Sequence, residues 1–296
     1  MPAAAPDRRR APRGRRPALR ALFSGALALV LAVGVPALER TGLVDGAGVA
    51  AAGPRRFPTP GHESTGSPLG HPEPVAVPSA SWSAGARGAD GEPARWDPCR
   101  PVHYVVNPEG APPGGEAVLA AALERVSRAT GLRFVSDGTT DETDRARPYD
   151  PQRWGDRWAP ALLRWNVPVE AAEDAARGHG ASGRGTGEQG AGEQGTGGVV
   201  LGRGGPVLAR TSSGRAVIVS GSAGVTASAL GDLGDPAVRR RVQAVWLHEL
   251  AHVVGLGHVE DPAQLMDPEF TGVAGFAAGD LTGLAALGGG PCLGEV

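Results

Sequence analysis

Apolar and polar positions between residues 96 and 292 follow two different periods, which predicts both strands and helices. Short apolar runs bounded by Gly, Pro or Asn predict strands at 102–106, 132–135, 161–167 and 216–219. Apolar residues at helical spacing predict helices at 115–130 and 280–287. A longer helix is expected to begin at Asp235-Pro236, with Asp as N-cap and Pro as the first helical residue. Its second half is apolar on several sides, which indicates that this part of the helix is buried.

The sequence pattern does not decide the secondary structure of two further stretches. Val199–Gly202 and Val207–Ala209 predict either a pair of strands broken by Gly or one bulged strand. Residues 136–159 are polar and interrupted by Pro, and no period in them indicates where Trp154 and Trp158 pack. His103 lies within the first predicted strand, where we expect it on a polar face.

Two segments contain too few apolar residues to predict a packed structure. Residues 38–95 are rich in Pro, Gly, Ser and Ala, which predicts a disordered linker or the remnant of a propeptide. Residues 178–198 are of low complexity and repeat Gly-Glu-Gln-Gly, which predicts a flexible surface insertion. We therefore expect one folded domain over residues 96–296.

The first 37 residues have the pattern of a targeting segment. An Arg-rich stretch precedes the apolar run from Ala21 to Val35, and Val35-Pro36-Ala37 offers small residues for cleavage. The length of the apolar run leaves open a cleaved signal peptide or an uncleaved membrane anchor. Both predict that the rest of the chain is extracellular, either secreted or tethered to the outer face of the membrane. The net charge of −2 argues against nucleic acid as a partner.

The helix that begins at Asp235 contains the residues that can carry chemistry. His248 and His252 are four residues apart, so both imidazoles lie on one face of the helix, and Glu249 lies beside them. Gly255 can adopt the left-handed conformation that ends a helix, which allows the chain to return His258 to the same metal ion. Three imidazole ligands leave a fourth position open, which is typical of catalytic rather than structural zinc.

The run from His248 to His258 reads HExxHxxGxxH, and Met266 follows it at a short distance. This arrangement resembles the metzincin zinc peptidases, and the matrixin branch most of all. Val259 and Asp267 depart from what many relatives have at these positions. The resemblance implies an α+β fold with a mixed twisted sheet, an active-site helix and a small C-terminal subdomain. It also implies that the region 199–209 is an edge strand, which would bind an extended peptide by strand addition.

The resemblance also implies a function. Zn²⁺ would be held by His248, His252 and His258, and Glu249 would act as the general base in the hydrolysis of protein or peptide substrates. Met266 would support the site by packing beneath the histidines, and we expect a monomer. Two alternatives remain: a non-catalytic secreted zinc-binding module, and an inhibited precursor in which residues 38–95 cover the cleft.

Cys99 and Cys292 are the two cysteines of the chain. An even pair in an exported protein predicts a disulfide. The resemblance offers another role, because matrixin zymogens use a propeptide cysteine to block zinc. The sequence around Cys99 lacks that motif and leads directly into a predicted strand, which favours the disulfide.

Overall fold

The computed structural model describes residues 57–145, 147–165, 192–196, 199–211 and 213–296, with backbone alone for 192–200. The predicted signal peptide or anchor at 1–37 and residues 38–56 of the predicted disordered segment lie outside these ranges, as do residues 178–191 and 197–198 of the predicted insertion. Within them, no helix combines the length and apolar character needed to cross a bilayer.

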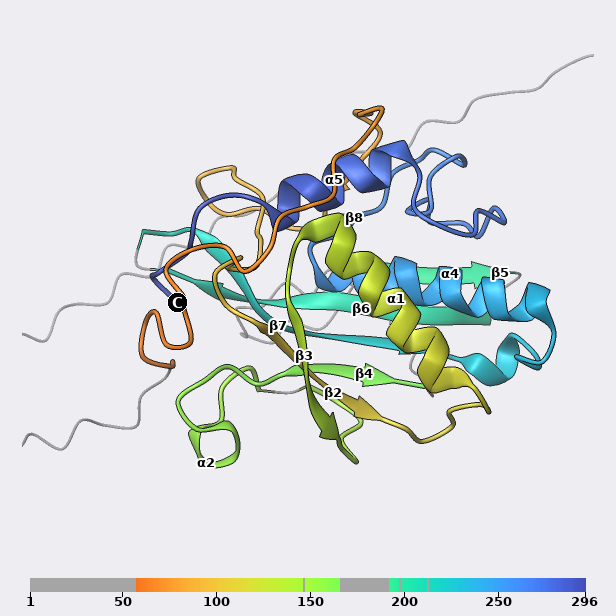
Figure 1. The fold of residues 1–296 in the computed structure, drawn as a ribbon, viewed down its shortest axis with the longest axis horizontal. Helices are drawn as coiled ribbons and strands as arrows, with labels where there is room; N and C mark the ends of the chain where they lie inside the picture. The colour runs from red at the N-terminus through yellow and green to blue at the C-terminus, as the bar shows by residue number, and fades with distance from the viewer. Residues whose placement is uncertain (1–56, 146, 166–191, 197–198, 212) are drawn as a thin grey trace, which may run out of the picture. The chain divides into compact units, whose positions relative to one another are not determined.

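A mixed sheet of six strands forms the centre of the fold, in the order β3-β2-β4-β7-β6-β5 (Figure 1). Strands β3, β2, β4 and β7 run parallel to one another, whereas β6 is antiparallel to β7 and β5 is antiparallel to β6. The sheet and its helices make the fold α+β, as predicted. The strands are β2 (Val102–Asn107), β3 (Phe134–Thr139), β4 (Ala161–Arg164), β5 (Gly192–Thr196), β6 (Val199–Arg210) and β7 (Ala216–Val225).

Helices α1 (Gly115–Thr130) and α4 (Pro236–Val253) lie next to each other on one face of this sheet (Figure 1). Both were predicted, and so was α5 (Ala278–Gly288), which follows them. The predicted N-cap of α4 is confirmed, because the carboxylate of Asp235 accepts a hydrogen bond of 2.7 Å from the amide of Ala237. Two short helices also occur among the described residues: α2 (Pro151–Trp154) and the 3-10 helix η1 (Ala227–Ala229).

Strand β7 is buried on both faces, as the fully apolar run at 216–219 predicts for an interior strand. Ile218 belongs to the main core between the sheet and the helices, where Trp165 and Trp246 meet edge to face at 5.0 Å. Val217 and Val219 belong to a second apolar cluster. Trp158, which the sequence pattern leaves unplaced, is buried in this second cluster with the C-terminal tail.

Several strand predictions change in detail. The strand predicted over 161–167 is β4, which ends at Arg164, and residues 166 and 167 lie outside the described ranges. The second strand begins later and runs further than predicted, because β3 includes the polar residues Ser136 and Asp137 on an outer strand of the sheet. The open question at 199–209 is resolved as one strand, β6, with an irregular register between Val207 and Leu208. The prediction that this strand forms the edge is wrong, because β5 pairs with its outer side.

The prediction of a flexible insertion over 178–198 is wrong for residues 192–196, which form β5. The pairing runs from Gly192 opposite Gly204 to Thr196 opposite Val199. Backbone pairing along a sheet edge requires no apolar side chains, so the composition of this segment could not indicate it.

The prediction of a disordered segment over 38–95 is wrong for residues 57–95, which are ordered against the rest of the fold. Strand β1 (Ser83–Ala84) pairs antiparallel with β8 (Leu256–Gly257), and Arg95 forms a bridge with Val217. Ala94 is buried in the main core. A segment of Pro, Gly and Ser cannot build its own core. It is held here by backbone hydrogen bonds to a surface that the remainder of the chain provides.

A disulfide joins Cys99 and Cys292 across 193 residues, which is the predicted pairing. It connects the loop before β2 to the tail after α5. The carboxylate of Asp97 supports both sides of this link, since it accepts hydrogen bonds from the amides of Cys99 (3.0 Å) and Leu293 (3.1 Å).

Candidate metal centre

The end of α4 and the chain that follows it bring the three predicted histidines together. His248 and His252 lie one turn apart on the buried half of α4. The helix then ends, and Gly255 adopts a φ of 102°, as predicted for a residue that reverses the chain. The Nε2 atoms lie 3.0 Å apart between His248 and His252, 3.1 Å between His248 and His258, and 3.2 Å between His252 and His258.

Two of the imidazoles are oriented by backbone carbonyls. His248 Nδ1 lies 2.8 Å from the carbonyl oxygen of Leu265, and His252 Nδ1 lies 2.8 Å from that of Leu256. A carbonyl oxygen can only accept, so each Nδ1 carries the proton and donates it. Each Nε2 is then left with its lone pair toward the centre of the cluster, which is how a metal-ligating histidine is prepared.

The donor set fits a zinc ion. Zinc with nitrogen ligands at about 2.0–2.1 Å in tetrahedral geometry would separate those nitrogens by about 3.3 Å. The observed separations of 3.0–3.2 Å are close to this value. Lone pairs that converge at such distances repel one another unless a cation lies between them. Among the described residues, no carboxylate or cysteine sulfur joins the three nitrogens in this cluster, which is consistent with an open fourth position.

Burial keeps these imidazoles neutral. It lowers the pKa of His248 well below its ordinary 6.5, with His252 as the second cause. Burial and then the neighbouring His258 lower the pKa of His252 to about 3. Burial also lowers the pKa of His258, the one ligand that is partly exposed. Neutral imidazoles are the form that binds a metal ion, so the cluster is in the right state at neutral pH.

Glu249 follows His248 on α4 and is fully buried. Strand β6 passes very close to it, because a Cβ at Gly202 would lie 2.7 Å from Glu249 Oε1. A Cβ at Gly204 would lie 2.4 Å from the Glu249 backbone oxygen, so β6 can take this position beside α4 only with glycine at both places. The sequence motif predicts the location of Glu249, whereas the close approach of β6 is visible only in the structure.

The predicted methionine turn is connected to the candidate metal ligands by backbone hydrogen bonds. Met266 is buried in the main core, and its carbonyl oxygen accepts a 3.0 Å hydrogen bond from the amide of Val259, next to His258. Leu265, the residue before it, provides the carbonyl that orients His248.

Asp280 is a supporting residue that the sequence reasoning missed. Its buried carboxylate accepts hydrogen bonds from the amides of Leu265 (2.8 Å), Met266 (3.3 Å) and Ala277 (2.8 Å). It therefore holds the methionine turn against the start of α5. An acidic residue in the first turn of a predicted helix also occurs without any such role, so the sequence held no signal that would have singled it out.

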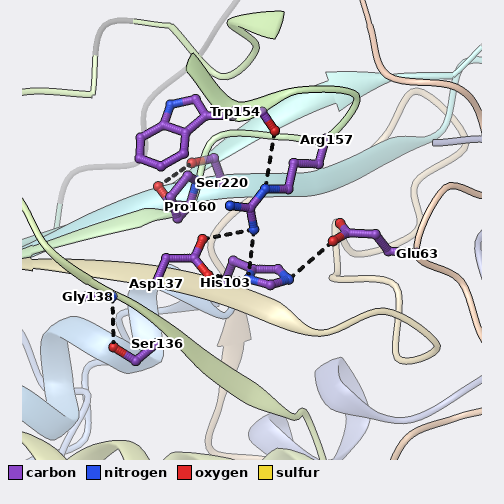
Figure 2. Close-up of polar contacts among 9 residues, drawn as sticks. All are labelled: Glu63, His103, Ser136, Asp137, Gly138, Trp154, Arg157, Pro160 and Ser220. Atoms are coloured by element: carbon purple, nitrogen blue, oxygen red, sulfur yellow. Dashed lines mark hydrogen bonds and ion pairs between the residues drawn. The ribbon is translucent and has the colours of Figure 1, made fainter. Parts of the chain in front are cut away.

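His103 lies in a separate polar cluster (Figure 2). Its Nδ1 is 2.8 Å from Asp137 Oδ1, and its Nε2 is 3.4 Å from Glu63 Oε1. The guanidinium of Arg157 lies 2.9 Å from Asp137 Oδ2 and 3.0 Å from His103 Nδ1. The cluster joins Glu63, from the segment predicted to be disordered, to β2 and β3. None of its members belongs to the metal centre.

Comparison of the chain with protein-family models and with curated proteins found no match. The functional argument for this protein therefore depends on the geometry of the site.

Proposed function

We propose that this protein is a zinc-dependent endopeptidase with the metzincin type of fold and site. The observation that carries the proposal is the convergence of three Nε2 atoms within 3.2 Å of one another, with Glu249 on the same helix as two of them. The parallel strands, the antiparallel strand β6 beside α4 and the tied methionine turn support the same assignment.

The residues of this site would have separate roles in metal binding and proton transfer. His248, His252 and His258 would hold the ion, which when bound supplies Lewis-acid chemistry that acidifies water and polarises a peptide carbonyl. Glu249 would accept the proton of the attacking water and later donate it to the leaving amine. The backbone carbonyls of Leu256 and Leu265 would keep two of the imidazoles in place. The carboxylate of Asp280 would hold the methionine turn by accepting hydrogen bonds from its backbone amides.

A peptide substrate that binds by strand addition cannot pair with a free edge of β6. Strand β6 is paired with β7 on one side and β5 on the other. A peptide would therefore pair with the outer side of β5, or take its place on β6. The disulfide supports an extracellular or membrane-tethered location for this activity, because disulfides persist in oxidising compartments.

A comparison of two variants tests the proposal. Glu249→Gln should retain one zinc ion per chain, because all three imidazoles remain, and should lose about 10²–10⁴-fold in peptidase activity, as is typical when a general base is removed. His258→Ala should instead lose zinc affinity, and its activity should fall in parallel. Zinc content by elemental analysis and cleavage of a mixed peptide library, with and without a chelator, provide both readouts.

The same experiment distinguishes the enzyme from a zinc-binding module. A module without turnover would bind zinc in the wild type and in Glu249→Gln and would cleave no peptide in either. A Glu249→Gln variant that holds zinc and cleaves peptides as fast as wild type would show that Glu249 has no catalytic part.

A further inference from the structure

The chain segment 79–85 lies along the loop that carries His258. The Ser83 hydroxyl donates a hydrogen bond of 2.6 Å to the carbonyl oxygen of His258 itself. Ser83 and Ala84 pair with Gly257 and Leu256 in the β1–β8 ladder, and the amide of Gly85 donates to the carbonyl oxygen of Gly255 at 2.9 Å. The segment therefore contacts the backbone on both sides of the turn between the second and third ligands.

The approach of this segment is close and depends on small residues. A Cβ at Gly257 would lie 2.8 Å from Ser83 Oγ, and a Cβ at Gly279 would lie 2.0 Å from the Ser81 carbonyl oxygen. The Ser81 hydroxyl also donates to the carboxylate of Asp261, three residues beyond His258. The loop between α4 and α5 and the segment 79–85 thus fit each other over several consecutive residues.

Strand β8 contacts His252 as well as β1. The carbonyl of Leu256 accepts the Nδ1 proton of His252, while Leu256 itself is paired with Ala84. A displacement of β1 would therefore free the turn at its outer side and affect two ligands: His258 through its own backbone, and His252 through the carbonyl that orients it.

We infer that residues 79–85 are a structural part of the metal centre, with Ser83 as a positioning residue for His258. This inference rests on the proposed zinc site. It gives the segment a role opposite to that of a propeptide remnant, because its removal would loosen the third ligand. Processing that yields an active form would have to cut the chain before Ser79, whose amide donates to Thr282 Oγ1 on α5 at 3.0 Å.

Zinc affinity of the full chain, measured by competition with a chromogenic chelator, tests this inference. Ser83→Ala removes the hydroxyl that holds the His258 carbonyl and should weaken zinc binding by about 10–100-fold, the range found for partners that orient metal ligands. Ser67→Ala is the matched control, because Ser67 is an exposed serine that precedes residues 79–85 in the chain. It should bind zinc as wild type does. The zinc-free variants should melt at similar temperatures, which would show that the effect is local.

Amide hydrogen exchange in the zinc-free protein provides a readout that does not depend on the metal. Exchange over residues 255–259 should be faster in Ser83→Ala and in Gly85→Pro, which lacks the donor to Gly255, and unchanged in Ser67→Ala. Unchanged exchange together with wild-type zinc affinity in Ser83→Ala would overturn the inference. If the wild type binds no zinc, the proposed function is wrong, and the exchange rates alone decide whether this segment positions the loop.

Discussion

At the scale of single residues, His103 is a group whose protonation is coupled to folding. The pKa of His103 is raised above its ordinary 6.5, chiefly by the carboxylate of Glu63 and further by that of Asp137. Partial burial of the imidazole acts in the opposite direction. The guanidinium of Arg157 faces the same ring. The folded state therefore binds this proton more tightly than the unfolded state. The resulting stability is fully present below pH 6.5 and is lost as the pH rises through the raised pKa.

This coupling predicts a pH-dependent difference between wild type and His103→Asn. The free energy of unfolding from urea titrations should favour wild type at pH 5.5, and this advantage should shrink by pH 8.5. Taking the difference cancels the opposite contribution of the metal-centre histidines, whose pKa values are lowered. His62→Asn is the control, since His62 is an exposed histidine that precedes Glu63 in the chain. A difference that stays constant with pH would mean that folding leaves the pKa of His103 unchanged, and an advantage that grows with pH would mean that folding lowers it.

At the scale of elements, α4 combines a capped, exposed start with a buried end that carries two of the candidate metal ligands. Asp235→Ala removes the acceptor for the amide of Ala237 and should destabilise the protein by about 1 kcal/mol. Asp235→Asn keeps an acceptor at this position and should remain close to wild type. Urea denaturation would measure both. Because the cap lies several turns from His248, zinc affinity should be the same in both variants, and a large fall in affinity would contradict this local role.

At the scale of the whole molecule, the disulfide closes a loop that contains most of the described fold. For a separation of 193 residues, the chain-entropy model gives an upper figure of about 5 kcal/mol. Cys292→Ala isolates the loss of the bond better than Cys99→Ala, because Cys99 is fully buried and its replacement would also remove core packing. The melting temperature of Cys292→Ala under non-reducing conditions should fall markedly.

Mass spectrometry of non-reduced peptides provides a direct check of the pairing. It should find Cys99 linked to Cys292 in the wild-type protein. A free Cys99 thiol whose alkylation raises peptidase activity would instead support the zinc-blocking role that matrixin propeptides suggest.

The sequence by itself determined those features that depend on residues close together along the chain. Helical spacing identified α1, α4 and α5, and the pair Asp235-Pro236 predicted the start of α4 because capping is a local interaction. The positions of His248, His252 and Glu249 follow from the same helical period. Gly255 indicated the reversal that returns His258, since few other residues adopt a positive φ. These local rules were sufficient to predict the candidate metal centre.

Only the tertiary structure decided how distant and compositionally featureless segments are used. Residues 57–95 and β5 lack an apolar pattern. The first segment is held by backbone pairing to β8, which lies far away in the chain, and β5 by backbone pairing to β6, the strand that follows it. The contacts of Asp280 with the methionine turn, and of Glu63 with His103, also join residues that no local period relates. A hydrogen bond between backbone groups is independent of the side chains that flank it. The composition of Ser83 and its neighbours therefore could not show that they lie against His258, the third candidate ligand.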